Sequence, residues 1–342
     1  MALIVTAAGC GSGSIEAPSS SGNTPTIKIA IGSNALNYVD YWVAEAEGLF
    51  KKHNVRVEIV NSNALAVAPA LLTSGQIDLL LSAVGQGVAV AATGKPVSIV
   101  YNLYNYSPGG AAFVGGSDIT SIEQLRDKGS DCKLATTQRG TGAYAFARQL
   151  MRAYDLRCQI SALATTALAV NSITSGQADA ATLAPADAAT VVEKGGHYLL
   201  NPATITDQEA AKIVPNPFPA LAVMGLAPAL QAKSREVENF LAALEEALKE
   251  ASSGDPGEIA QKISTLTYFP GLSTETMTRS LTPTLAGLPT TSEGGQITEG
   301  AWSTALKSFQ EDFDLPGFDA ADPRFAYAKL IDMSYLDRAK KQ

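Results

Sequence analysis

The chain has 342 residues, enough for two domains of ordinary size, and 46% of them are hydrophobic while 17% are charged. This composition excludes disorder over most of the chain, and a formal net charge of −8 argues against a nucleic-acid partner, whose phosphates need basic patches. No apolar run is long enough to span a bilayer, and three Cys with two His leave little room for a Cys/His metal site, so we expect neither metal nor cofactor.

The first 26 residues read as the end of an export signal followed by a tether. A short apolar run leads to Ala7-Ala8-Gly9-Cys10, which resembles the lipobox of bacterial lipoproteins with Cys10 as the lipidated residue. The run has no basic region before it, and Ala7 stands where the lipobox has Leu. The Gly-, Ser- and Pro-rich stretch that follows has the composition of a flexible linker. The alternative is an ordinary N-terminus with a chance Cys.

From residue 26 to about 101 the chain alternates short strands with helices. Strands are predicted from period-two alternation or short apolar runs, and helices from apolar residues three and four apart. The predicted strands are 26–31, 55–60, 79–81 and 97–101, and the predicted helices are 39–50, 66–72 and one that ends at Ala92. Such alternation is typical of an α/β domain with a parallel sheet.

The same pattern begins again near residue 133. Its predicted strands are 133–136, 159–163 and 180–183, and its predicted helices are 142–154 and one that ends at Thr174. Thr73-Ser74-Gly75-Gln76-Ile77-Asp78 and Thr174-Ser175-Gly176-Gln177-Ala178-Asp179 close a helix at the same place in each half. The repeat therefore predicts two similar lobes.

The chain then returns to the first lobe. A strand is predicted at 220–226 and a long helix at 235–251, and the remaining helical pieces are expected to pack against one lobe as a cap. The predicted organisation is a tether over 1–26, lobe 1 from 27–113 plus 220–342, and lobe 2 from 114–219.

Two further cysteines are relevant to whether the protein is exported to an oxidising compartment. Cys132 and Cys158 each precede a predicted parallel strand, so both lie at one edge of a sheet, where a disulfide is geometrically plausible. An exported protein could form that bridge. Two unpaired buried thiols are the alternative.

Four segments carry a resemblance to a known family: YWVAEAEGLFK (41–51), VRVE (55–58), LLTSGQID (71–78) and GKPV (94–97). As a set they resemble the periplasmic-binding-protein-like proteins for nitrate, sulfonates, taurine and thiamine precursors, over about residues 27–250. The resemblance implies a type II two-lobe protein that delivers a solute to an ABC permease. It also implies a location outside the cytoplasm, attached to the membrane only by a lipid at Cys10. We expect a monomer.

The ligand site is expected beyond the carboxyl ends of the strands, where loops and helix N-termini converge in open α/β sheets. Four loops qualify, after the strands that end near residues 31, 81, 136 and 183. The predicted ligand-binding residues are Asn34, Asn37, Tyr38, Tyr41, Ser82, Ala83, Gln86, Tyr104, Gln138, Arg139, Gly140, Thr141, Gly142, Asp187 and Phe218.

The loop 138–142 is the most informative of the four. It places a cation, glycine amides and a hydroxyl at a helix N-terminus, which suits an oxyanion, and Arg139 could hold a carboxylate or sulfonate bidentately. Alternatively the glycines only turn the chain and Arg139 points to water. The Tyr104 ring could pack against an aromatic or apolar part of the ligand. We therefore predict a small organic anion, a sulfonate or carboxylate.

Asp187 points to a second ligand class. It would repel an anion unless it orients Arg139, whereas a cationic ligand would favour it. A neutral or cationic pyrimidine of the thiamine-precursor type is thus the alternative ligand. A fold-related enzyme is less favoured, because neither His53 nor His197 belongs to a nucleophile–base or metal pattern.

Overall fold

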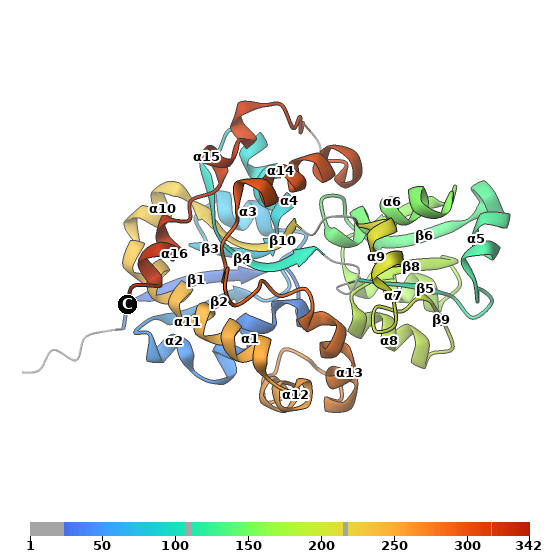
Figure 1. Cartoon of the computed structure of the whole chain (residues 1–342), viewed down its shortest axis with the longest axis horizontal. Helices are drawn as coiled ribbons and strands as arrows, with labels where there is room; N and C mark the ends of the chain where they lie inside the picture. The colour runs from blue at the N-terminus through green and yellow to red at the C-terminus, as the bar shows by residue number, and fades with distance from the viewer. Residues whose placement is uncertain (1–23, 107–110, 215–217, 316) are drawn as a thin grey trace, which may run out of the picture.

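A computed structural model describes residues 24–106, 111–214, 218–315 and 317–342, which form two lobes, each built on a five-stranded sheet (Figure 1). The predicted α/β class and two-lobe architecture are confirmed. Cys10 and nearly all of the predicted tether lie outside the described residues. In the part of the chain that is described, no helix combines the length and the apolar character needed to cross a bilayer.

Lobe 1 has the strand order β2-β1-β3-β10-β4. Strand β1 runs parallel to β2 and β3, whereas β10 pairs antiparallel with both β3 and β4. Helices cover both faces, and Trp42 of α1 lies fully buried. The elements are β1 (Thr26–Ile31), η1 (Leu36–Tyr38), α1 (Val39–Ala46), α2 (Leu49–Lys52), β2 (Arg56–Asn61), α3 (Ala68–Thr73), β3 (Leu79–Ala83), α4 (Val84–Ala92), β4 (Val97–Tyr106), β10 (Phe218–Leu226), α10 (Ala227–Ala232) and α11 (Ser234–Ser253).

Lobe 2 has the corresponding order β7-β6-β8-β5-β9. Strand β6 is parallel to β7 and β8, and β5 is antiparallel to β8 and β9. The elements are β5 (Ala112–Gly115), α5 (Ile122–Lys128), η3 (Gly129–Asp131), β6 (Lys133–Thr137), α6 (Gly142–Tyr154), β7 (Gln159–Leu163), α7 (Thr166–Thr174), β8 (Ala180–Leu183), α8 (Pro185–Glu193), β9 (His197–Leu200) and α9 (Asp207–Ile213). The sequence patterns missed β5 and β9, which are only four residues each.

The crossovers between lobes come earlier than predicted. Strand β5 begins at Ala112 in the sheet of lobe 2, and β10 begins at Phe218 in the sheet of lobe 1. The predicted boundaries at 113/114 and 219/220 therefore fall inside these two strands. Both strands enter their sheet directly after a crossover, so lobe membership changes before the strand starts.

The region after α11 contacts both lobes, which corrects the prediction of a cap on one lobe. Helix α13 packs on α8 and η4 packs on α6, both in lobe 2, while α14 packs on β10 in lobe 1. Its elements are α12 (Pro256–Ile263), α13 (Thr274–Leu285), α14 (Glu299–Ser308), η4 (Phe309–Phe313), η5 (Pro323–Phe325), α15 (Tyr327–Leu330) and α16 (Ser334–Ala339). Phe309 and Phe313 pack against Phe218, so an aromatic cluster lies beside the second crossover.

A disulfide joins Cys132 to Cys158. The two residues immediately precede β6 and β7, which are parallel neighbours. The bridge therefore ties the amino ends of two strands, at the edge of lobe 2 opposite the strand ends that face lobe 1.

Candidate ligand-binding site

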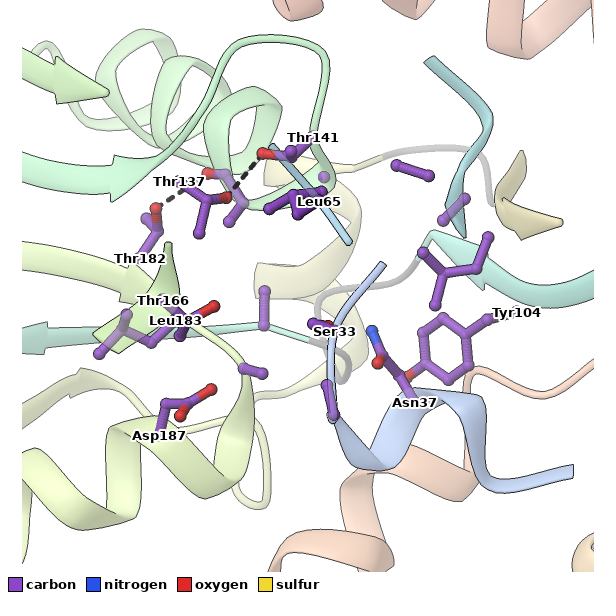
Figure 2. Close-up of a pocket in the computed structure, with 18 of the residues that line it drawn as sticks. Ser33, Asn37, Leu65, Tyr104, Thr137, Thr141, Thr166, Thr182, Leu183 and Asp187 are labelled. Carbon is purple, nitrogen blue, oxygen red and sulfur yellow. Dashed lines mark hydrogen bonds between the residues drawn. The ribbon is translucent and has the colours of Figure 1, made fainter. Parts of the chain in front are cut away.

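A cavity of about 120 Å³ lies between the two lobes (Figure 2). Ser33, Asn37 and Tyr38 reach it from the segment after β1, and Tyr104 reaches it from β4. The opposite wall comes from lobe 2, from the ends of β6 and β8 and the starts of α6 and α8. The cavity thus lies at the carboxyl ends of the parallel strands, where the fold class predicts a ligand.

Several predicted residues line this cavity together. They are Asn37, Tyr38, Ala83, Tyr104, Thr141, Gly142 and Asp187. Asn34 lies just outside them, in an adjoining groove of about 480 Å³ that shares Asn37 and Asp187 with the cavity and is bounded by Tyr268 and Phe269. Asp187 therefore stands where the cavity meets the groove.

Four predicted residues lie behind the wall instead of in it. Tyr41 is buried in the core of lobe 1, with its ring against Trp42 and Phe50, because it lies on the side of α1 that packs on α11. Ser82 is buried beneath Gly32, where a Cβ would lie 2.6 Å from the serine Oγ and 2.8 Å from the Tyr38 hydroxyl. Gln86 and Phe218 are also buried and contribute nothing to the cavity surface.

The loop 138–142 does not form the predicted anion cradle. Arg139 has a 61% exposed side chain, and its Nη1 lies 3.2 Å from Asp314 Oδ2, outside the cavity. The Gln138 side chain donates to Leu65 O at 2.7 Å, and Gly140 N donates to Phe313 O at 3.1 Å. The loop is thus bound to lobe 1 and to the C-terminal region, because a positive φ at Gly140 turns the chain toward them.

Among the described residues, Asp187 is the acidic residue of the cavity wall, and no Lys or Arg lines it. Its carboxylate lies in the first turn of α8 and has no hydrogen-bond or ion-pair partner in the described part of the chain. Burial raises the pKa of Asp187 to about 6. Burial also raises the pKa of Tyr38 well above its usual range, so that hydroxyl stays neutral.

Sequence reasoning missed Ser33, Leu65, Thr137, Thr166 and Thr182, all of which line the cavity. Thr137 and Thr182 lie near the carboxyl ends of strands that were predicted, so polar residues at strand ends were the available signal. The groove residues Tyr268 and Phe269 had no such signal, because they follow α12 in the C-terminal region.

The histidines lie away from the cavity. His53 Nε2 is 2.9 Å from Glu246 Oε2, and His197 begins β9, where its Nε2 contacts Ser117 O. Among the described residues, no group of three or more His, Cys, Asp and Glu is arranged to hold a metal ion.

Comparisons with known proteins agree on the fold. Residues 35–258 match the family described as NMT1/THI5 like, and no curated protein matches the sequence. The periplasmic nitrate-binding protein NrtA from Synechocystis PCC 6803 is 16% identical, with a TM-score of 0.70 over 93% of this chain and 89% of that one. The alkanesulfonate-binding protein SsuA from Xanthomonas axonopodis pv. citri, bound to MOPS, is 16% identical, with a TM-score of 0.66 over 90% of this chain and 98% of that one.

A third solved structure has a slightly higher structural similarity. It is the ligand-binding component of an ABC-type import system from Staphylococcus aureus with zinc bound, with a TM-score of 0.74 and 13% identity, over 93% of this chain and all of that one. At these identities the likeness concerns the two-lobe fold.

Proposed function

Because the chain belongs to the NMT1/THI5-like family, we propose that it is a solute-binding protein that captures a small molecule between its lobes and delivers it to an ABC importer. One observation carries the proposal: a cavity whose walls come from both lobes, at the carboxyl ends of their parallel strands. Binding there links the lobes and favours their closure by hinge motion, and the closed form is what a permease recognises. The fold shared with nitrate- and sulfonate-binding proteins supports this role.

The same proposal places the protein outside the cytoplasm, held to the membrane by a lipid on Cys10. The disulfide between Cys132 and Cys158 supports an oxidising compartment. We propose a monomer as the working unit, because one chain supplies both walls of the cavity.

A binding role is favoured over catalysis. The part of the cavity wall that the structure describes offers hydroxyls, amides and one carboxylate, without a His or Cys that could form a nucleophile–base pair. The predicted organic anion depends on Arg139, which is directed to Asp314. An anion and a neutral or cationic pyrimidine-type solute are therefore both included in the first binding test.

The test is a thermal-shift screen against nitrate, sulfonates, carboxylates, amines and pyrimidines. A solute at a hundred times its dissociation constant should stabilise the protein by about 2.7 kcal/mol, which gives a readable rise in Tm. Small-angle scattering with the same solute should show a more compact particle. A solute that raises Tm without compaction would contradict capture by closure.

A matched pair of variants locates the site. Ala184 lines the cavity at the start of α8, whereas Ala189 lies on the same helix and outside the cavity. Ala184→Leu should abolish the thermal shift by filling the cavity, and Ala189→Leu should leave it unchanged. Equal shifts in both variants would show that the solute binds elsewhere.

A further inference from the structure

Three of the four threonine hydroxyls in the described lobe 2 wall have their protons committed to the protein, and the fourth, that of Thr166, can donate or accept. Thr141 Oγ1 lies 2.8 Å from Gln138 O, and a carbonyl only accepts, so Thr141 donates there. In the 2.7 Å contact between Thr137 and Thr141, Thr137 is then the donor. Thr182 Oγ1 donates to Ala143 O at 2.8 Å by the same reasoning. Each hydroxyl has one proton, so Thr137 and Thr182 can present a lone pair to the cavity, whereas both lone pairs of Thr141 already accept, from Thr137 and from Tyr144 N.

The helix N-termini around the cavity are also largely occupied. At the starts of α6 and α7, Thr141 and Thr165 accept hydrogen bonds from Tyr144 N and Leu168 N, as helix caps do. Helix α8 begins with Pro185, which has no N–H to offer. The start of α4 is covered by lobe 2, since a Cβ at Gly85 would lie 2.4 Å from Gly140 O. Several backbone N–H groups that could hold an anion at these helix starts are therefore capped, missing or covered.

The remaining polar groups of the site include two acceptors without a partner among the described residues, the half-buried Asp187 carboxylate and the buried Oδ1 atom of Asn37. Asp187 has no hydrogen-bond or ion-pair partner among the described residues, and the Oδ1 atom of Asn37, on the opposite wall, is buried without one. Figure 2 shows Asp187 reaching from α8 and Asn37 reaching from lobe 1 toward the space between the lobes. A carboxylate that is partly withdrawn from water is stabilised by a donor, preferably a charged one.

From this arrangement we infer that the site takes a small ligand with a protonated nitrogen, such as an amidinium, an ammonium or a protonated amino-heterocycle, whose N–H groups donate to Asp187. The inference rests on the proposed solute-binding function and names its ligand class. The raised pKa of Asp187 agrees, because it records the cost of burying this carboxylate without a cation. Ser33, Tyr38 and Tyr104 can each donate or accept, so they suit the remaining polar groups of the ligand.

The cavity also limits the size of the charged part. Its volume of about 120 Å³ is below the roughly 150 Å³ of an engineered cavity that binds benzene. A larger ligand can extend past Asp187 into the outer groove, where Tyr268 and Phe269 offer aromatic surface. The charged head would then lie inside and an apolar or aromatic part outside.

Two isosteric series test the charge of the ligand. The probes are acetamidinium, acetamide and acetate, and benzamidinium, benzamide and benzoate, each titrated by calorimetry against the whole protein. We expect an amidinium to bind at least tenfold more tightly than its amide, and the carboxylate to bind most weakly. Asp187→Asn should remove most of the amidinium preference with Tm unchanged or raised. Glu299→Gln, which alters an exposed acid in the first turn of α14, is the control and should change neither affinity nor Tm.

The outcomes separate the inference from the proposed function. Binding of acetate or benzoate, retained or improved in Asp187→Asn, would overturn the cationic ligand and leave solute binding intact. An amidinium that binds equally well to Asp187→Asn would overturn the role of Asp187. If no member of either series binds, while another solute raises Tm and Ala184→Leu abolishes that rise, the inferred ligand class is wrong and the proposed function stands. If no solute of any class binds, both fail.

Discussion

The repeated turn makes the same contacts in both lobes. In lobe 1 the Asp78 carboxylate accepts from Lys28 N at 2.7 Å, and Asp78 N donates to Lys28 O at 2.8 Å. In lobe 2 Asp179 makes the same two bonds with Lys133, at 2.8 and 2.9 Å. Gly75 and Gly176 have φ of +71° and +73°, which glycine adopts without strain. The sequence repeat therefore corresponds to a repeated hydrogen-bonded turn that connects the start of β3 to β1 and the start of β8 to β6.

The lobes differ in how the rest of each sheet is secured. In lobe 1 the edge strand β4 is ten residues long, and the segment before α14 covers it through Asn102 N to Gly295 O and Asn105 N to Gly287 O. In lobe 2 the corresponding edge strand β9 has four residues, and a disulfide links the amino ends of β6 and β7 at the opposite side. The smaller lobe, with its short strands, is thus stabilised by a covalent bond, whereas the larger lobe is stabilised by the segment before α14.

Lobe 1 also buries a carboxyl group, and this group gives the largest expected effect. Asp40 is fully buried in lobe 1, its Oδ1 accepts from Tyr41 N at 2.8 Å, and its Oδ2 is buried without a partner among the described residues. Burial, reinforced by the charge of Glu245, raises the pKa of Asp40 to about 8. The folded state therefore keeps a proton that the unfolded state loses near pH 4, and stability must fall as pH rises between these values.

The limiting slope for one such group is about 1.4 kcal/mol per pH unit. Asp40→Asn keeps the acceptor for Tyr41 N and removes the titration, so its free energy of unfolding should be flatter in pH and higher than wild type at pH 8. Urea unfolding at pH 5, 6.5 and 8 measures this, with the exposed Asp118→Asn in lobe 2 as control. Parallel pH profiles for wild type and Asp40→Asn would contradict the explanation.

The disulfide gives the second effect, and it belongs to lobe 2. The two cysteines are 26 residues apart, a loop for which cross-linking is expected to contribute about 3.5 kcal/mol. In a Cys132→Ser/Cys158→Ser variant, hydrogen exchange should accelerate in β6, β7 and α6 far more than in β1 and β3. Uniform acceleration across both lobes would show that the bridge stabilises the whole protein instead of its own lobe.

Much of the fold could be predicted because parallel β-α units leave local patterns. Apolar runs and helical spacing located β3, β8 and α6, and the repeated turn identified two lobes. The antiparallel strands β5 and β10 gave weaker signals, because their place in a sheet depends on where the chain crosses between lobes. The boundaries predicted around them were accordingly a few residues late.

The site was predictable to the level of loops and not of side chains. Asn37, Tyr38, Thr141 and Asp187 lie in the wall because strand ends dictate where these loops converge. Arg139 lies in the correct loop and points elsewhere, because its direction depends on Asp314, a partner remote in sequence. No local pattern reports such a contact.

The third prediction compares the two turns directly. Asp78→Ala and Asp179→Ala each remove a charged acceptor from a backbone N–H, and the Lys233 or Lys128 ammonium also loses its partner. Each change should cost about 2 kcal/mol. Asp78→Asn and Asp179→Asn keep the acceptor for the backbone and should cost less than half as much. If one alanine variant were neutral, the shared geometry of the turns would not mean a shared role.

The smallest effect on stability is expected where the lobes meet. Segment 309–315 continues lobe 1 from α14 and binds α6 of lobe 2, where Asp312, 3% exposed, accepts from Arg152 Nη1 at 2.7 Å and from Gln149 Nε2 at 3.1 Å. Next to it, Asp314 accepts from Arg139 and from the Tyr144 hydroxyl at 3.2 and 3.3 Å. The segment therefore holds the same loop that supplies Thr141 and Gly142 to the cavity.

Asp314→Asn weakens an exposed ion pair, which should cost less than about 1 kcal/mol. Asn tolerates the left-handed backbone that Asp314 adopts at φ +50°, so the turn itself is kept. Since the pair fixes the loop across the lobe boundary, amide exchange over 138–144 should rise several-fold while β1 and β3 stay protected. Asp322→Asn removes a comparable exposed pair with Arg324 that is confined to lobe 1, and should leave 138–144 unchanged. Equal exchange in the two variants would mean that the Arg139–Asp314 pair does not restrain the loop and that its other contacts, such as Gly140 N to Phe313 O, hold it.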